Sequence, residues 1–179
     1  MIRNMSLSKT VVLNVLIILF WNIYIFFLCR QMKSSFFNPQ KKPYKARNFE
    51  CGGKFYNEKL KIKKWKEVLP QYISKNGFSK RRFSEKNLIY INRFILETCR
   101  AEWNHKMCMI IAFPITIFNE FKIGIIFTLL ILLTNLPFIF IQRYNRFRLL
   151  SLKRHRVKKS FFAQEQNDNS KIEVPSYYV

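Results

Sequence analysis

The feature that most constrains this sequence is a run of 19 residues, 11–29, without a charged side chain. At about 1.5 Å per residue, a helix of that length nearly crosses a hydrocarbon core of roughly 30 Å. Basic residues flank the run at Arg3, Lys9 and Arg30. The apolar run of a signal peptide is shorter, about 7–15 residues, and no cleavage site of the A-x-A type follows. We therefore expect an uncleaved membrane anchor over residues 1–29, with a signal sequence as the alternative.

The composition separates into apolar and basic blocks. The 179 residues carry 32 Lys and Arg against 10 Asp and Glu, while 49% of them are hydrophobic. A soluble or disordered chain this basic would be less apolar. Apolar blocks in lipid and basic blocks beside an anionic surface reconcile the two numbers. The composition and the absence of internal repeats exclude a solenoid or a disulfide-stapled domain.

Residues 30–106 form a basic interfacial region with 20 Lys and Arg, six acidic residues and no long apolar run. Within it, residues 59–69 have the pattern of a helix lying in the lipid interface with its tryptophan at headgroup level. The apolar side chains that share one face of this helix are Ile62, Trp65 and Leu69. A second helix is predicted from about residue 85 to residue 106, with Ser84 as its N-cap.

The second apolar block, residues 107–141, is interrupted by a polar turn. It consists of the 12 uncharged residues 107–118, the tetrapeptide Asn-Glu-Phe-Lys, and the 19 uncharged residues 123–141. We predict a transmembrane helical hairpin whose first span borrows length from the preceding helix, with a re-entrant hairpin as the alternative. A basic juxtamembrane helix is expected at 142–163 and a disordered tail at 164–179.

The basic residues predict the orientation of the chain. Most of them lie in residues 30–106 and after residue 141, while Lys122 is the one basic residue in the turn. By the positive-inside rule, both basic blocks face the cytoplasm, where anionic membrane lipids attract each basic residue by about 1 kcal/mol. The prediction is an all-α integral membrane protein with three spans, its N-terminus and turn outside.

Polar residues at the boundary of the second span are candidate site residues. Glu97, Glu102 and His105 are candidate catalytic groups, and Arg100 and Asn104 are candidate substrate-binding groups. On a helix, Glu97 shares a face with His105, and Glu102 precedes His105 by three positions. Either glutamate is able to hydrogen-bond one imidazole nitrogen and leave the other free to accept a proton, as general base catalysis requires. An interfacial helix in which Arg100 satisfies Glu97 is the alternative.

Further candidates, all for substrate binding, lie in and after the last span. Asn135 is an amide in an apolar run, which indicates a helix partner or a polar cavity, and a structural kink at Pro137 is the alternative. Arg143, Asn145 and Arg146 follow at the same boundary as His105. They are candidates for binding the phosphates of an acyl donor, and attraction to anionic lipids is the alternative.

Other chemistries have weaker support. The scattered cysteines fit a reduced cytoplasmic face, and no ligand spacing of a zinc site is present, so no metal is expected. A nucleophilic Cys99 is the alternative to a histidine base. The second histidine, His155, lies in a cationic run that accounts for it. Nucleic acid is not an expected partner, because the aromatic residues follow amphipathic rather than stacking spacing.

Several segments in the same order resemble the glycosyl-4,4'-diaponeurosporenoate acyltransferase family. They are ETCRAEWNH at 97–105, NLP at 135–137, QRYNRFRLL at 142–150, and parts of the middle region from Lys54 to Gly77. The resemblance implies an enzyme of C30 carotenoid synthesis in a bacterial cell membrane, which esterifies a glucose 6-hydroxyl of a glycosylated apocarotenoid with a fatty acyl group. It implies a glycosyl carotenoid acceptor, an acyl-CoA or acyl-carrier-protein donor, no further cofactor, and a setting in which other pigment-pathway enzymes are candidate partners. It carries over no catalytic residue.

The leading hypothesis is direct acyl transfer from a cytoplasmic thioester to the sugar hydroxyl. His105 would remove the hydroxyl proton, with Glu102 or Glu97 fixing its tautomer, and the nearby arginines would hold donor phosphates or the developing oxyanion. No nucleophile elbow of the G-x-S-x-G type is present to indicate an acyl-enzyme. The alternative is a non-catalytic membrane scaffold that organises pigment or envelope enzymes.

Overall fold

The computed structural model describes residues 5–69 and 88–170, without the side chains of residues 166–170, and every regular element in these ranges is helical. The long helices are α1 (Leu7–Gln31), α4 (Leu88–Ile110) and α6 (Phe121–Ser170). The short ones are η2 (Ser34–Phe37), η3 (Asn48–Gly53), α2 (Lys54–Glu58), α3 (Ile62–Trp65) and α5 (Ala112–Phe118). The predicted N-cap at Ser84 lies outside the described residues.

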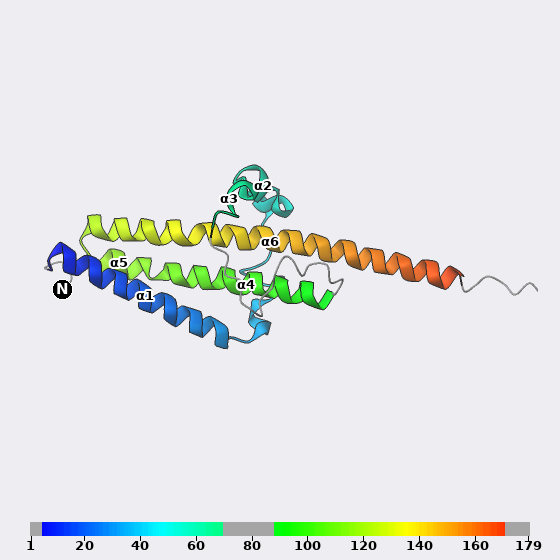
Figure 1. Ribbon diagram of the computed structural model, residues 1–179, viewed down its shortest axis with the longest axis horizontal. Helices are drawn as coiled ribbons and strands as arrows, with labels where there is room; N and C mark the ends of the chain where they lie inside the picture. The colour runs from blue at the N-terminus through cyan, green and yellow to red at the C-terminus, as the bar shows by residue number, and fades with distance from the viewer. Residues whose placement is uncertain (1–4, 70–87, 171–179) are drawn as a thin grey trace, which may run out of the picture.

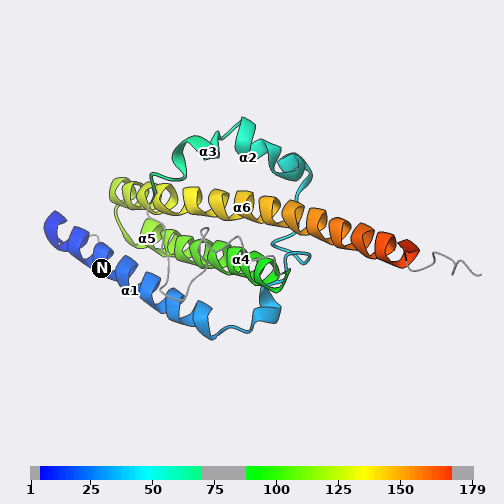
Figure 2. The ribbon, with the colours of Figure 1, turned by 45° about the vertical axis from the view of Figure 1, so that its right-hand side comes forward.

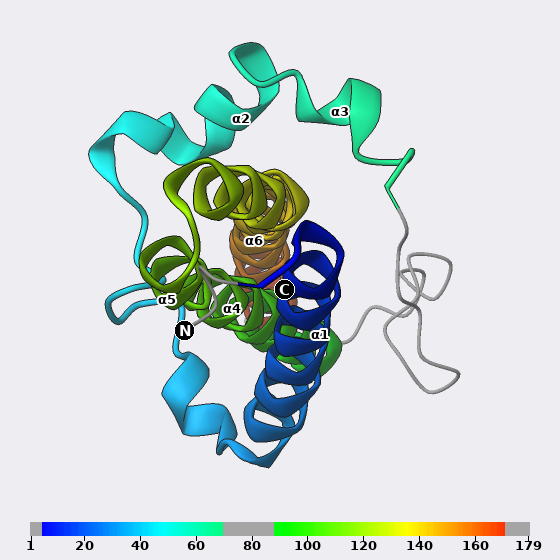
Figure 3. The same ribbon diagram turned by 90° about the vertical axis from the view of Figure 1, so that its left-hand side faces the viewer.

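The helices are arranged in layers around α6. Figure 1 shows α4 and α5 running antiparallel along α6, with α1 on the outer side of α4 and the η3–α2–α3 segment on the opposite side of α6. The end-on view in Figure 3 shows the same order. The chain reverses between α5 and α6 at Asn119 and Glu120, inside the predicted turn. The break between α4 and α5 has a local cause, since Pro114 has no N–H to donate to the carbonyl of Ile110.

Two helices, α1 and α6, are long and apolar enough to cross a membrane. In the most apolar part of α1 only 11% of the residues are buried inside the protein, and in that of α6 only 22%. Their large apolar side chains therefore face outwards, as in helices surrounded by lipid.

Polar contacts join α1 to the α4–α5–α6 unit. The side-chain amides of Asn14 and Asn119 are buried and donate to each other at 2.8 and 3.0 Å. The Trp21 indole N–H donates to the Met107 carbonyl at 2.9 Å. As Figure 2 shows, α1 lies alongside the rest of the helices rather than apart from them. The first apolar run is thus a packed element of the fold.

The structure corrects the predicted helix at 59–69. The chain leaves helical geometry at Lys61, which has a φ of +48°, and only residues 62–65 form a helical turn, α3. Ile62, expected to face lipid, is fully buried in a cluster with Tyr56 and Tyr144 of α6. An amphipathic face is able to bury itself against protein as well as lipid, and here it packs on α6.

The structure also differs at the C-terminal end of the chain. The apolar run, the basic run and residues up to Ser170 form one continuous helix, although a tail was expected from residue 164. Good helix formers such as Ala163, Gln164 and Glu165 let the helix propagate beyond the apolar segment.

Candidate active site

The side chain of His105 faces α6. Its Nδ1 lies 3.0 Å from the Oδ1 of Asn135, and its ring stacks on Phe138 with 4.8 Å between ring centroids and 7° between the planes. The amide of Asn135 is held in turn, because its Nδ2 donates to the carbonyl of Ile131 at 2.9 Å. The α4–α6 packing thus brings together two candidate residues that are 30 positions apart in sequence.

Near His105 lies a cluster of ion pairs, called here the buried ion cluster, whose members are buried Glu50, Glu102, Arg143 and Arg146 and half-buried Lys106. Glu102 is fully buried and accepts a hydrogen bond from Arg143 Nη1 at 2.9 Å, as well as bonds from Lys106 and Arg146. A buried carboxylate needs such partners, since its charge is otherwise too costly to remove from water.

Arg143 connects this cluster to the segment before α2. Its Nε and Nη2 donate to the two carboxylate oxygens of Glu50 at 2.5 and 2.6 Å, the bidentate geometry of strong arginine pairs. Its Nη2 also donates to the carbonyl of Lys45 at 3.2 Å. The Tyr56 hydroxyl donates to the same glutamate. One guanidinium therefore joins η3, α4 and α6.

These contacts keep Glu50 ionised although it is fully buried. Burial by itself raises the pKa of this carboxyl, but the hydrogen bonds from Arg143, Tyr56 and the Arg47 backbone N–H hold the pKa below its ordinary value. The pKa of Tyr56 is raised, by burial and by its hydrogen bond to the Glu50 carboxylate. With two carboxylates and three cations, the buried ion cluster carries a net charge of +1.

The predicted contact between a glutamate and His105 is not the one found. Glu102 turns to the cations of α6, and Glu97 pairs with Arg100 at 2.8 Å, which was the alternative interpretation of that residue. The hydrogen-bond partner of the imidazole is instead the amide of Asn135. The reason is packing, since the face of α4 that carries Glu102 meets the arginines of α6.

The residues predicted to bind substrate do not form one site in the structure. Arg143 and Arg146, expected to bind donor phosphates, are buried and bonded to carboxylates inside the protein. Asn104 donates to Cys108 Sγ at 3.9 Å, and its buried Oδ1 has no hydrogen-bond partner among the described residues. Asn145 lies half-buried on α6, two residues after Arg143.

Sequence reasoning missed three members of this region: Glu50, Tyr56 and Phe138. Glu50 gave one usable signal, as one of only six acidic residues in the basic segment 30–106. An acid in such a segment is a candidate for pairing, but its partner Arg143 is 93 positions away and no local pattern points to it.

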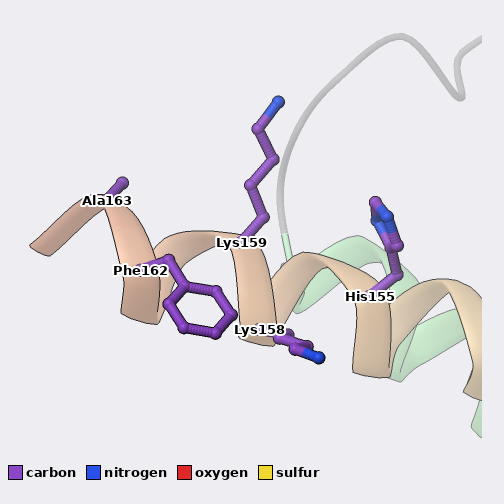
Figure 4. Close-up of a pocket in the computed structure, with 5 residues that line it drawn as sticks. All are labelled: His155, Lys158, Lys159, Phe162 and Ala163. Carbon is purple, nitrogen blue, oxygen red and sulfur yellow. The ribbon is translucent and has the colours of Figure 1, made fainter. Parts of the chain in front are cut away.

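Other chemistries find little support in the described part of the chain. Cys99 is buried, and its Sγ accepts from Arg146 Nη1 at 3.0 Å. No group of three or more His, Cys, Asp or Glu side chains there is placed to hold a metal ion. A shallow, open hollow near the C-terminal end of α6, lined by His155, Lys158, Lys159, Phe162 and Ala163 (Figure 4), involves none of the candidate catalytic residues.

Comparisons with known proteins agree on one family. The family model for glycosyl-4,4'-diaponeurosporenoate acyltransferase matches residues 40–155, a range that includes His105, Asn135 and the whole buried ion cluster. The chain is similar to the glycosyl-4,4'-diaponeurosporenoate acyltransferase of Staphylococcus aureus strain MRSA252, with 32% identity over 128 residues, 69% of this chain and 76% of the relative. It is 34% identical to that of strain N315 over 115 residues, 62% of this chain and 68% of the relative. No solved structure matches the chain.

Proposed function

The chain belongs to the glycosyl-4,4'-diaponeurosporenoate acyltransferase family, and from this premise we propose that it transfers a fatty acyl group to a sugar hydroxyl of a glycosylated C30 apocarotenoid, giving a staphyloxanthin-like pigment. Family membership favours an enzyme over the non-catalytic scaffold that the sequence left open. The observation that carries the proposed site is the His105–Asn135 pair, a polar contact between α4 and an asparagine within the apolar run 123–141 of α6. An ionisable residue such as His105 beside a membrane-spanning segment is a functional-site hypothesis by default.

The proposed membrane arrangement has three spans. Residues 11–29 of α1 and 123–141 of α6 would each cross the bilayer, and α5 with the end of α4 would complete a hairpin with α6. The start of α1 and the 119–120 turn lie at the same end of the structure, as Asn14 and Asn119 are in contact. This agrees with an N-terminus and turn outside and with basic residues 30–106 and 142–163 at the cytoplasmic face, near anionic lipid.

In the proposed reaction, His105 is the general base. A ring nitrogen takes the proton of the sugar hydroxyl while the hydroxyl oxygen attacks the carbonyl carbon of the acyl thioester. The C–S bond then breaks, the ester forms, and the thiolate leaves with the proton from the imidazolium. The donor is the thioester of an acyl-CoA or of an acyl-carrier protein, and the acceptor is a lipid, so a site at the membrane boundary is accessible to both.

The buried ion cluster is proposed to hold this site in place. Because Arg143 and Arg146 are engaged with carboxylates, we assign them, with Glu102, to fixing α6 against α4 rather than to contact with the donor. Arg100 and Asn145 remain candidates for substrate contact. Asn104 is a further candidate, because its Oδ1 has no partner among the described residues and the residue is next to His105.

The test is acyl transfer by His105→Ala compared with His155→Ala. The second histidine is exposed on the C-terminal part of α6, so its replacement controls for loss of an imidazole elsewhere. A lost general base lowers the rate by about 10²–10⁴-fold. Each variant is expressed in a pigment-producing host that lacks its own acyltransferase, and the extracted lipids are separated.

Accumulation of the unacylated glycosyl carotenoid with His105→Ala, but not with His155→Ala, is the expected result. Equal ester formation by both variants, at matched protein levels in the membrane fraction, would refute the base assignment. No ester from the unsubstituted protein would refute the proposed reaction itself.

A further inference from the structure

We propose that Asn135 sets the tautomer of His105, so that Nδ1 carries the proton and Nε2 is the basic atom. This inference rests on the proposed function, because it assigns the proton-accepting atom of the proposed base. It gives Asn135, which the sequence offered as a substrate-binding residue, a positioning role instead.

The orientation of the Asn135 amide is decided by its second hydrogen bond. The carbonyl of Ile131 only accepts, so the amide group facing it at 2.9 Å is the Nδ2 donor. A flipped amide would set two oxygen acceptors against each other there. The Oδ1 therefore faces His105 at 3.0 Å, and since an amide oxygen only accepts, the Nδ1 of the neutral ring carries the hydrogen.

A second contact fixes the plane of the ring. Phe138, one turn after Asn135 on α6, stacks on the imidazole with 7° between the ring planes. A half-turn of the ring about its Cβ–Cγ bond would place a carbon where Nδ1 now donates, and the hydrogen bond would be lost. Amide and phenyl ring together therefore hold one tautomer in one orientation.

The remaining nitrogen is left for chemistry. Nε2 has no hydrogen-bond partner within residues 5–69 and 88–165, and in this tautomer it carries a lone pair. The charged residues closest to His105 in sequence on α4 are Glu102 and Lys106, and these are bonded to each other in the buried ion cluster. The neutral amide of Asn135 orients the ring without adding a negative charge that would stabilise the imidazolium. The protonated His105 is therefore able to pass its proton to the departing thiolate.

The first test observes the tautomer directly in the full chain. Because the chain has only two histidines, long-range proton–nitrogen correlation spectra of ¹⁵N-histidine-labelled protein in micelles assign both rings, with exposed His155 as the internal reference. We expect protonated Nδ1 and unprotonated Nε2 for His105. A neutral His105 with its proton on Nε2 would overturn the inference while leaving the base assignment intact.

The second test uses two substitutions at the same position. Asn135→Leu removes the acceptor, and we expect tautomer averaging and a drop in kcat of about 10–100-fold with little change in KM, by analogy with the loss of residues that orient metal-bound histidines. Asn135→Asp keeps the acceptor and adds a charge that favours the imidazolium. It should retain more activity than Asn135→Leu and shift the rising limb of the pH–rate profile to higher pH.

Asn92→Leu, at an exposed asparagine of α4, is the matched control and should leave rate and spectrum unchanged. If Asn135→Leu and Asn135→Asp kept the parental kcat and pH profile while His105→Ala was inactive, the positioning role would be wrong and the proposed function would stand. Parental activity of His105→Ala would overturn the positioning role together with the base assignment, whereas no ester from the unsubstituted protein would overturn the proposed reaction.

Discussion

Arg143 provides the sharpest test of how the site is held together. Arg143 is 5% exposed, and its guanidinium binds Glu50 and Glu102, which are both 0% exposed. In an Arg143→Ala variant, Glu102 keeps two cations, but Glu50 keeps only neutral donors, namely the Tyr56 hydroxyl and a backbone N–H. Leaving one member of a buried ion pair without its partner typically costs about 3–5 kcal/mol.

That cost is large against the stability of a folded domain, about 5–15 kcal/mol. We therefore expect Arg143→Ala to lower the free energy of unfolding by about 3–5 kcal/mol. The measurement is denaturant unfolding in mixed micelles, followed by circular dichroism. Arg154→Ala is the matched control, because Arg154 is exposed on the same helix and its loss should change the free energy by less than about 0.5 kcal/mol.

A double variant distinguishes the loss of the Glu50–Arg143 attraction from the cost of leaving the Glu50 carboxylate buried without a cation. In Glu50→Gln combined with Arg143→Met, no uncompensated carboxylate remains at position 50, so the free energy of unfolding should recover by at least half of the loss. If Arg143→Ala unfolds at the same denaturant concentration as Arg154→Ala, the buried ion cluster does not stabilise the fold and our account of it is wrong.

Three further predictions follow from the geometry. Because the pKa of Glu50 is depressed, its ionised carboxylate stabilises the fold at neutral pH, and this contribution is lost as the pH falls below about 4.5 towards the folded-state pKa. In Glu50→Gln, the free energy of unfolding should therefore change less between neutral and acidic pH. Asn14→Leu alone leaves Asn119 without its amide partner and should lower the free energy of unfolding by about 1–3 kcal/mol. Combining it with Asn119→Leu should restore part of that free energy, as measured in a double-mutant cycle. Gly53→Ala should lower the thermal unfolding midpoint more than Gly52→Ala, since both have positive φ but only at Gly53 would the new Cβ meet a side chain of α6, at 2.9 Å; equal midpoints would contradict this.

The sequence by itself predicted the apolar helices, the family and the position of His105 beside the second apolar block. Uncharged runs of 19 residues, 11–29 and 123–141, predicted two long apolar helices, because in lipid a segment of that length has to satisfy its own backbone hydrogen bonds. The order of short segments such as residues 97–105 identified the family, which the comparisons confirmed. Periodicity also placed His105 on a helix next to the apolar block.

Partners across the fold were decided only by the tertiary structure. Helical spacing offered Glu97 and Glu102 as partners of His105 because both lie within two turns of it, but α6 supplies Asn135 for the ring and two arginines for Glu102. Periodicity describes which residues share a face, and it does not say what that face meets. The register between α4 and α6 depends on how their side chains pack, so contacts 30 to 93 positions apart are determined by packing that no local pattern encodes.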